Sequence, residues 1–194
     1  MRREEKMTPR EYLDILHTAE RLKDTMRHSA TSGGRVESVG EHSWRVSLMA
    51  FLLKDVFPEA DIDKVVRMCL IHDLGECFTG DIPVFAKTDA DTKKEDQLLR
   101  DWVGTLPGKM AEEMKALYDE MDALETTEAK IYKALDKLEA LIQHNEAPIS
   151  TWEDHEYSLQ QTYAWPNVEF SPWLKELRQE ILNDTLEKIE EAKS

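Results

Sequence analysis

The sequence is poor in glycine, proline and cysteine. Its 194 residues include 7 glycines, 7 prolines and 2 cysteines. Glycine and proline usually make up about 12% of a protein, so their scarcity favours regular helices over turns and loops. The cysteines, Cys69 and Cys77, lie close together in one segment. That spacing excludes a disulfide framework and predicts reduced thiols.

Long apolar runs and positive charge are also scarce. No run approaches the roughly 18 apolar residues that cross a bilayer, and the N-terminal segment MRREEKMTPR does not resemble a signal peptide. We therefore expect a cytoplasmic protein with no membrane partner. The 25 basic residues are outnumbered by 40 acidic ones, which gives a net charge of -15. Because this charge repels DNA and RNA at long range, no nucleic-acid partner is expected.

Helical periodicity runs through most of the chain. Thr8-Pro9-Arg10-Glu11 is a capping box with proline at the first helical position, and it predicts a helix over about 8–26. Apolar spacing predicts further helices from Glu41 to Pro58, from Asp61 or Asp63 to Gly75, around 98–103, over 110–121 and 127–145, and from Ser171 onward. Residues 28–40 and 86–96 are expected to be exposed, and 148–170 irregular.

No stretch alternates long enough to predict a sheet. The expected fold class is therefore all-α. The length suits one compact domain, so we expect residues 1–194 to form a single helical domain.

The pair His72-Asp73 carries the first chemical signal, where the apolar stripe of a predicted helix ends. An adjacent imidazole and carboxylate can bind one divalent ion, and an aspartate buried without such a partner is unfavourable. The alternative is a histidine that satisfies carbonyls at a helix C-terminus. Two other residues favour the metal: His42, in the first turn of the preceding helix, and Asp136, within the segment Ala-Leu-Asp-Lys-Leu.

Together these two histidines and two aspartates would offer four ligands from three helices. Their mixed nitrogen and oxygen donors suit Mn, Fe, Co, Zn or Ni. A set of this kind predicts metal-assisted hydrolysis. For Asp136 the alternative is a surface carboxylate paired with Lys133 or Lys137.

Three stretches carry a resemblance to a known family. They are Arg-Leu-Lys at 21–23, Arg-Val-Glu-Ser-Val-Gly-Glu-His-Ser at 35–43, and His-Asp-Leu-Gly-Glu-Cys-Phe-Thr-Gly-Asp-Ile-Pro at 72–83. With Asp136, they resemble the HD-domain superfamily of metal-dependent phosphohydrolases, and more closely its small 5′-deoxynucleotidase group. The resemblance covers a motif-bearing core of about 10–145 and leaves a C-terminal helical extension of about 146–194.

The resemblance implies that His42, His72, Asp73 and Asp136 bind the main metal, and that Arg27, Glu76 and Asp81 are catalytic. If the helix continues past Gly75, Glu76 shares a face with His72 and Asp73 and can reach water acidified by the ion, the expected nucleophile. Asp81 could protonate the leaving 5′-oxygen or hold a sugar hydroxyl. In some similar proteins the residues matching Glu76, Asp81 and the Ile82 carbonyl surround a second ion such as Mg. Ordinary capping and turn chemistry is the alternative for both carboxylates.

Arg27 matches the phosphate-orienting arginine of the nucleotidase group. Its planar fork can hold two phosphate oxygens, although compensation of a helix dipole is the alternative role. Residues 21–35 also carry a local excess of positive charge that could focus an anionic substrate. His28 stands where some such nucleotidases carry a tryptophan near the sugar. Arg27, His28 and Asp81 are therefore the predicted substrate-binding residues.

The resemblance implies a 5′-nucleotidase that converts (deoxy)ribonucleoside 5′-monophosphates into nucleoside and phosphate. One alternative is another HD phosphohydrolase that acts on nucleoside triphosphates or signalling nucleotides. The other is a non-catalytic sensor of a nucleotide or a metal. Similar proteins often form dimers, so a homodimer is also expected as one outcome.

Overall fold

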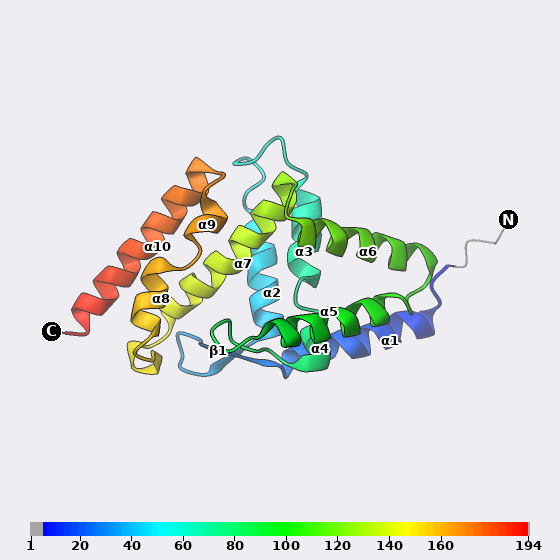
Figure 1. The fold of residues 1–194 in the computed structure, drawn as a ribbon, viewed down its shortest axis with the longest axis horizontal. Helices are drawn as coiled ribbons and strands as arrows, with labels where there is room; N and C mark the ends of the chain where they lie inside the picture. Colours follow the sequence, from blue (N-terminus) through cyan, green and yellow to red (C-terminus); the bar gives the residue numbers. More distant parts are fainter. Residues whose placement is uncertain (1–5, 194) are drawn as a thin grey trace.

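The computed structural model describes residues 6–193 and consists mainly of helices, as the sequence predicts (Figure 1). The all-α fold class is confirmed. In chain order the elements are α1 (Pro9–Ala19), η1 (Glu20–Lys23), β1 (Met26–Ala30), β2 (Val36–Ser38), α2 (Val39–Phe51), α3 (Ile62–Ile71), α4 (Glu76–Thr79), α5 (Asp89–Val103), α6 (Gly108–Ala123), α7 (Thr127–Glu146), η2 (Ile149–Thr151), α8 (Glu156–Thr162), α9 (Trp165–Val168) and α10 (Pro172–Glu191).

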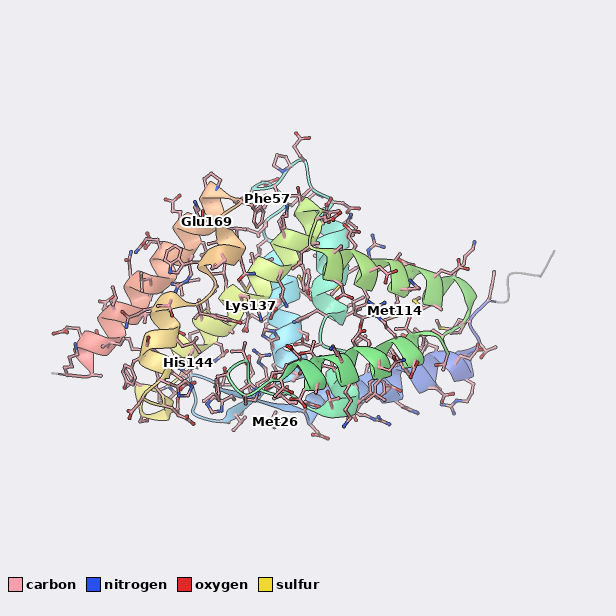
Figure 2. All side chains as sticks on the ribbon, in the orientation of Figure 1. Met26, Phe57, Met114, Lys137, His144 and Glu169 are labelled. Atoms are coloured by element: carbon pink, nitrogen blue, oxygen red, sulfur yellow. The ribbon has the colours of Figure 1, made fainter. Side chains whose placement is uncertain are left out.

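Helix α7 contacts several other helices of the fold. The helices α2 and α3 contact each other and α7, while α6 and α10 contact α7 at different places (Figure 1). Ile131, Ala134, Leu135 and Leu138 recur at helical spacing on α7 and are at most 1% exposed. Burial of one large apolar side chain contributes about 1.5–3 kcal/mol, so this stripe fixes α7 in the core. Lys137 lies near the middle of α7 and His144 near its C-terminal end (Figure 2).

A two-stranded antiparallel hairpin replaces the loop expected over residues 28–40. Strands β1 and β2 pair, and the turn between them is closed by hydrogen bonds between Thr31 and Arg35 and between Gly34 and Thr31. Gly34 has φ of 82°, a conformation that glycine adopts without strain. The strands are too short for alternation to show in the sequence. The hairpin also places Arg27 and His28 on β1, whereas the sequence predicted Arg27 at the end of the first helix and His28 in the loop.

The first helix is shorter than predicted, and the second begins earlier. The capping box at Thr8 is present as predicted, but α1 ends at Ala19 and the chain tightens into η1, which places Leu22 in the core. The second helix begins at Val39 rather than Glu41, because Ser38 and Glu41 form a capping box of their own. As a result, His42 lies in the first turn, where its side chain is fully buried.

The predicted helix through Gly75 ends earlier, at Ile71. Residues 72–75 form turns in which the amide of Leu74 donates to Ile71 and that of Glu76 to Asp73. These hydrogen bonds span three residues and tighten the chain relative to an α-helix. Helix α4 then starts at Glu76. The expectation that one α-helix continues past Gly75 is therefore wrong, although Glu76 still lies close to Asp73.

Three other segments also differ from expectation. Helix α5 starts at Asp89, because Thr88 forms a capping box with Asp91 inside the stretch expected to be exposed and polar. The segment 148–170, expected to be irregular, contains the short helices η2, α8 and α9. The last helix begins after Ser171, as predicted. Among the helices of residues 6–193, none is long and apolar enough to cross a membrane.

Candidate metal and substrate site

Four predicted ligands from three parts of the fold converge beside α7. Nε2 of His42 lies 3.3 Å from Nε2 of His72 and 3.7 Å from Oδ2 of Asp73. Oδ1 of Asp136 lies 3.5 Å from Nε2 of His42 and 3.7 Å from Nε2 of His72. Nε2 of His72 and Oδ2 of Asp73 are 3.1 Å apart. Each imidazole Nε2 thus lies 3.7 Å or less from both aspartates, and the donor atoms of His42, His72 and Asp73 all lie within 4.8 Å of one another.

Hydrogen bonds at the other ring nitrogens aim both imidazoles toward the two aspartates. Nδ1 of His72 is 2.8 Å from the carbonyl oxygen of Cys69, which can only accept, so Nδ1 carries the hydrogen. Nδ1 of His42 contacts the buried carboxylate of Glu139. In each ring Nε2 is left facing the aspartates. Such a second partner is the usual means of orienting a metal-binding histidine.

Positive charge at the centre of the cluster is favourable, because the carboxylates of Asp73 and Asp136 face it. Burial and Arg27 lower the pKa of His42, but hydrogen bonds to Asp136 and Glu139 raise it overall to about 10. Without a cation, a proton on Nε2 of His42 therefore supplies this positive charge. Oδ2 of Asp73 is buried and has no hydrogen-bond partner. A divalent cation fits the donor set, since it would replace the proton and engage that oxygen.

Asp136 has features of both roles that the sequence allows, a metal ligand and a carboxylate paired with lysine. Its carboxylate contacts Lys133 Nζ at 3.0 Å and Lys137 Nζ at 3.5 Å. However, Asp136 is only 8% exposed, so it is not a surface residue. Although burial raises the pKa of Asp136, Lys137 and Lys133 lower it more strongly, so the net shift is downward. The lysines hold Oδ2, which leaves Oδ1 turned toward the two imidazoles.

Arg27 extends from β1 to the edge of this cluster. Its Nε lies 3.3 Å from Oε2 of Glu37, and Nη1 lies 3.8 Å from Oδ2 of Asp73. The side chain is 14% exposed. Burial alone would lower the pKa of Arg27, but Asp73 and the other surrounding carboxylates raise it, so the guanidinium stays charged. Glu37 thus pairs with the guanidinium of Arg27 at the edge of the ligand cluster.

Glu76, Asp81 and Ile82 line the cavity that opens beside the cluster, as do Arg27, Asp73 and Asp136. Burial raises the pKa of Glu76 to about 9, with Asp73 and Asp81 adding to the effect. Burial also raises the pKa of Asp81, which Arg27 partly offsets. These two carboxyl groups therefore share one partly desolvated space.

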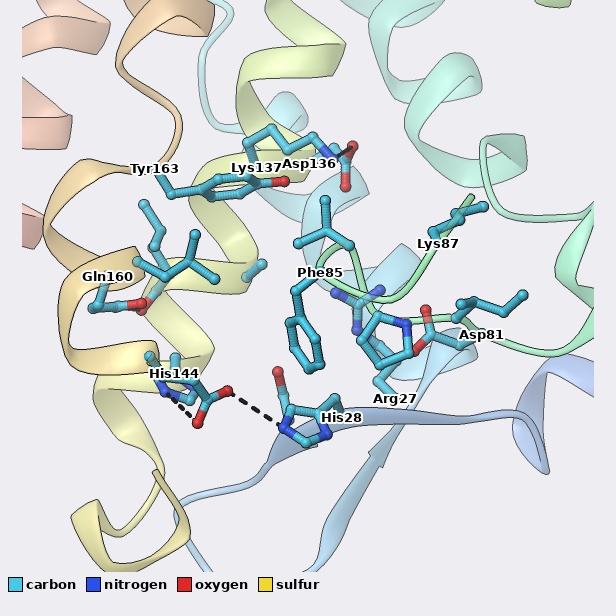
Figure 3. A pocket seen from close by; sticks show the side chains of 18 of the residues that line it. Arg27, His28, Asp81, Phe85, Lys87, Asp136, Lys137, His144, Gln160 and Tyr163 are labelled. Carbon is cyan, nitrogen blue, oxygen red and sulfur yellow. Dashed lines mark hydrogen bonds and ion pairs between the residues drawn. The ribbon is translucent and has the colours of Figure 1, made fainter. Parts of the chain in front are cut away.

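The cavity has a volume of about 220 Å³ and continues away from the cluster to His28, His144, Gln160 and Tyr163 (Figure 3). Phe85 projects into the middle of this space from the loop after α4, and its ring lies edge-on to that of His28, with centroids 5.2 Å apart. The four predicted metal ligands and all predicted catalytic and substrate-binding residues thus lie around one connected site.

This chain is matched by the family model described as HD domain over residues 19–178. That range includes all the residues of the candidate site. The chain belongs to the HD domain family. The match extends beyond residue 145 and so includes the helices that form the far end of the cavity.

Individual HD-domain relatives support this assignment. The chain is 32% identical to the 5′-deoxynucleotidase HDDC2 of Homo sapiens over 114 residues, which are 58% of this chain and 55% of the relative. It is 32% identical to the 5′-deoxynucleotidase HDDC2 of Dictyostelium discoideum over 145 residues, or 68% and 75% of the two chains. The chain thus spans about half the length of the human relative and three quarters of the other.

A solved structure shares the fold over nearly its whole length. It is a predicted metal-dependent phosphohydrolase from Magnetospirillum magnetotacticum MS-1, which superposes with a TM-score of 0.81 at 28% identity. The superposition covers 92% of this chain and 93% of the other.

Several site residues of this HD domain were missed in the sequence. Glu139 could have been noticed, because it lies one helical turn after Asp136 and faces the same way. Glu37 belongs to the unpredicted hairpin. His144 has no second potential ligand at metal spacing in the sequence, and Glu156 lies in the segment expected to be irregular. Only the tertiary fold brings the last two into the cavity.

Proposed function

We propose that the chain is a metal-dependent 5′-nucleotidase that hydrolyses deoxyribonucleoside 5′-monophosphates to nucleoside and inorganic phosphate. One observation carries this proposal: the donor atoms of His42, His72, Asp73 and Asp136 converge beside the guanidinium of Arg27. A cation site next to a phosphate-binding arginine suits phosphate monoester hydrolysis. The names of the curated HD-domain relatives support the same activity.

His42, His72, Asp73 and Asp136 would hold one divalent ion. Their nitrogen and oxygen donors suit Mn, Fe, Co, Zn or Ni. When bound, the ion supplies positive charge for the phosphate and acidifies water. Glu76, Asp81 and the carbonyl of Ile82 offer oxygen donors for a second ion such as Mg, which is the alternative use of these groups.

The chain's own residues account for the remaining steps. Arg27 donates hydrogen bonds to two phosphoryl oxygens and stabilises the charge that develops on them. Water attacks phosphorus, the bond to the 5′-oxygen breaks, and that oxygen takes a proton. Glu76 and Asp81, which line the cavity, handle the two protons: one carboxyl group takes the proton that the water loses, and the other donates a proton to the 5′-oxygen. His28 lies beside the sugar.

Chelation and reloading test the activity. The purified protein is dialysed against chelator, reloaded with Mn, Co or Zn, and assayed for phosphate release from deoxyribonucleoside 5′-monophosphates. We expect release only after reloading, and its loss in His42→Ala. The matched control is His17→Ala, because His17 lies on α1, far in sequence from the ligands, and should leave the rate unchanged.

The products released from nucleotides distinguish the proposed nucleotidase from the two alternative functions. Pyrophosphate or triphosphate released from a nucleoside triphosphate would indicate another kind of HD phosphohydrolase. If a fully metal-loaded protein binds nucleotide but releases no phosphate, pyrophosphate or triphosphate, it is a sensor, and the proposed activity is wrong. Sugar preference and self-association stay predictions, to be measured with paired ribo- and deoxyribonucleotides and by light scattering.

A further inference from the structure

The far end of the cavity lies well away from the proposed metal ligands. Helix α7 lines the cavity with Asp136, Lys137, Ala140, Leu141 and His144. An α-helix rises about 1.5 Å per residue, so the eight residues from Asp136 to His144 span about 12 Å. A phosphate held by Arg27 beside the metal ligands therefore cannot reach His144. Whatever contacts His144 belongs to another part of the ligand.

A buried carboxylate lies at this far end. Oε1 of Glu156 is 3.4 Å from Nε2 of His28, and Oε2 is 3.5 Å from Nε2 of His144 (Figure 3). Glu156 is 6% exposed and accepts a hydrogen bond of 2.6 Å from the backbone amide of Glu153. A carboxylate has about four acceptor positions, so most of its capacity is unused.

His144 supports the presence of a ligand here. Its Nε2 is buried and has no hydrogen-bond partner, and His144 is 9% exposed. Burial lowers the pKa of His144, with Glu156 acting in the opposite direction, so the ring is neutral. An unpartnered polar atom at a cavity wall is unfavourable unless a ligand or water completes its hydrogen bonds.

A second metal site does not explain this cluster. Among residues 6–193, the groups whose ligand atoms lie within 4.8 Å of one another include neither Glu156 nor His144. No lysine or arginine of this part of the chain is paired with Glu156. The backbone contact to Glu153 does explain why α8 starts here, but a neutral glutamine would provide it equally well.

The middle of the cavity suits a flat, partly apolar group. Ala140, Leu141 and Leu159 line it, and Phe85 contributes an aromatic ring. An aromatic side chain beside aliphatic walls favours a planar heterocycle, which can contact ring faces and still direct polar edges outward. From the ligand cluster to Glu156 the cavity is therefore charged, then apolar, then polar. A nucleotide can follow the same order, with its charged phosphate at the ligand cluster, the ring face of its base in the apolar middle, and the polar edge of the base at Glu156.

We propose that this far end is a nucleobase subsite in which Glu156 accepts hydrogen bonds from the N–H groups of the base. The inference rests on the proposed function, which places the phosphate at Arg27. Guanine offers two adjacent donors, its ring N1–H and its amino group, to one carboxylate. Thymine offers a single N–H between two carbonyl oxygens, which the carboxylate repels. Glu156 thus favours guanine over thymine.

The test compares kcat/KM for dGMP, dTMP and 2-deoxyribose 5-phosphate, which lacks a base. A hydrogen bond to a charged group contributes about 1.5–3 kcal/mol, so we expect dGMP to be preferred over dTMP by about tenfold or more. Glu156→Gln should reduce this preference at least fivefold and should impair dGMP more than deoxyribose 5-phosphate. Its melting temperature verifies folding.

Glu153→Gln is the matched control. Glu153 carries a carboxylate near His28, at 3.6 Å, but it is 56% exposed and does not line the cavity. The preference for dGMP should survive in this variant. If wild type shows no preference, or if Glu156→Gln keeps it, the base subsite is wrong.

Nucleoside binding separates the subsite from the hydrolytic activity. Calorimetry with deoxyguanosine and thymidine on chelator-treated wild type needs neither phosphate nor turnover. Tighter binding of deoxyguanosine, weakened in Glu156→Gln, supports the subsite even if no phosphate is ever released, in which case the nucleotidase proposal alone fails. Equal affinities for the two nucleosides together with normal phosphate release would overturn the subsite alone.

Discussion

Glu139 and His42 are hydrogen-bonded although 97 positions separate them in the sequence. The carboxylate of Glu139 contacts Nδ1 of His42, and both side chains are fully buried. This contact fixes which imidazole nitrogen faces Asp73 and Asp136. A carboxylate in this place also makes the imidazole a stronger ligand.

Replacing Glu139 with glutamine should weaken metal binding, and it should also lower the stability of the metal-free protein, in which the Glu139 carboxylate stabilises protonated His42. Glutamine keeps the shape and the acceptor but removes the charge, and loss of such a partner typically lowers metal affinity by about 10–100-fold. The measurement is a competition titration with a chromogenic chelator, alongside the melting temperature of the metal-free protein. Glu146→Gln is the control, since Glu146 lies on the same helix but pairs with Arg45. Equal affinity in both variants would exclude a positioning role.

Arg27→Lys should lower kcat much more than it changes KM. Lysine keeps the positive charge but cannot bind Glu37 and two phosphoryl oxygens in one plane. Removing one donor to a developing oxyanion usually lowers the rate by about 10²–10³-fold, so a loss of that size is expected. Steady-state kinetics with a deoxyribonucleoside 5′-monophosphate measure it. Arg35→Lys, on the same hairpin but 63% exposed, should behave like wild type. A kcat for Arg27→Lys within threefold of wild type would contradict this role.

The helices could be predicted from the sequence because their signals are local. The Thr8 capping box, the proline after Ser171 and the apolar spacing on α7 each involve neighbours within a few residues. The hairpin could not be predicted in this way. Strand β2 has three residues, and its buried positions hold the polar Glu37 and Ser38 while Val36 is exposed, which reverses the usual pattern. Glu37 faces inward because Arg27 lies there.

The residues of the candidate site likewise divide into those with a local sequence signal and those that only the tertiary fold brings together. His72, Asp73, Glu76 and Asp81 fall within one short motif, so the sequence shows them together. Glu156 reaches the cavity only because α8 packs beside α7, a contact with no local signature. Whether residues 1–194 form a single domain stays a prediction.

Gly80→Ala should destabilise the protein through backbone strain alone. Gly80 has φ of 77° and ψ of 166°, and an added Cβ would meet nothing within 4 Å. Alanine in such a conformation costs about 1–3 kcal/mol, and relaxing the strain would displace the neighbouring Asp81. Gly80→Ala should therefore unfold at a lower urea concentration and release phosphate more slowly than wild type. Gly33→Ala is the control, since Gly33 lies in the hairpin turn without positive φ. Unchanged stability in Gly80→Ala would show that the loop absorbs the change.

Arg178→Met should loosen the helix that carries Glu156. Arg178 is fully buried in α10 and donates hydrogen bonds to the carbonyls of Tyr163 at 3.0 Å and Gln160 at 2.8 Å. Its guanidinium also lies 4.7 Å from the ring centre of Trp165. Methionine fills the space but leaves both carbonyls without a donor, and each such loss costs about 1–3 kcal/mol, partly offset because a buried charge is removed.

The expected loss for Arg178→Met is about 2–4 kcal/mol in the free energy of unfolding, from two buried acceptors left unsatisfied. Hydrogen exchange should accelerate in α8 before the rest of the core, because the broken contacts join α8 and the following segment to α10. The control is Gln179→Met, since Gln179 is exposed and bonds only to Asn183 nearby. A surface change of this kind usually stays within about 0.5 kcal/mol. Uniform acceleration across all helices would instead mean that Arg178 stabilises the whole fold rather than the attachment of α8.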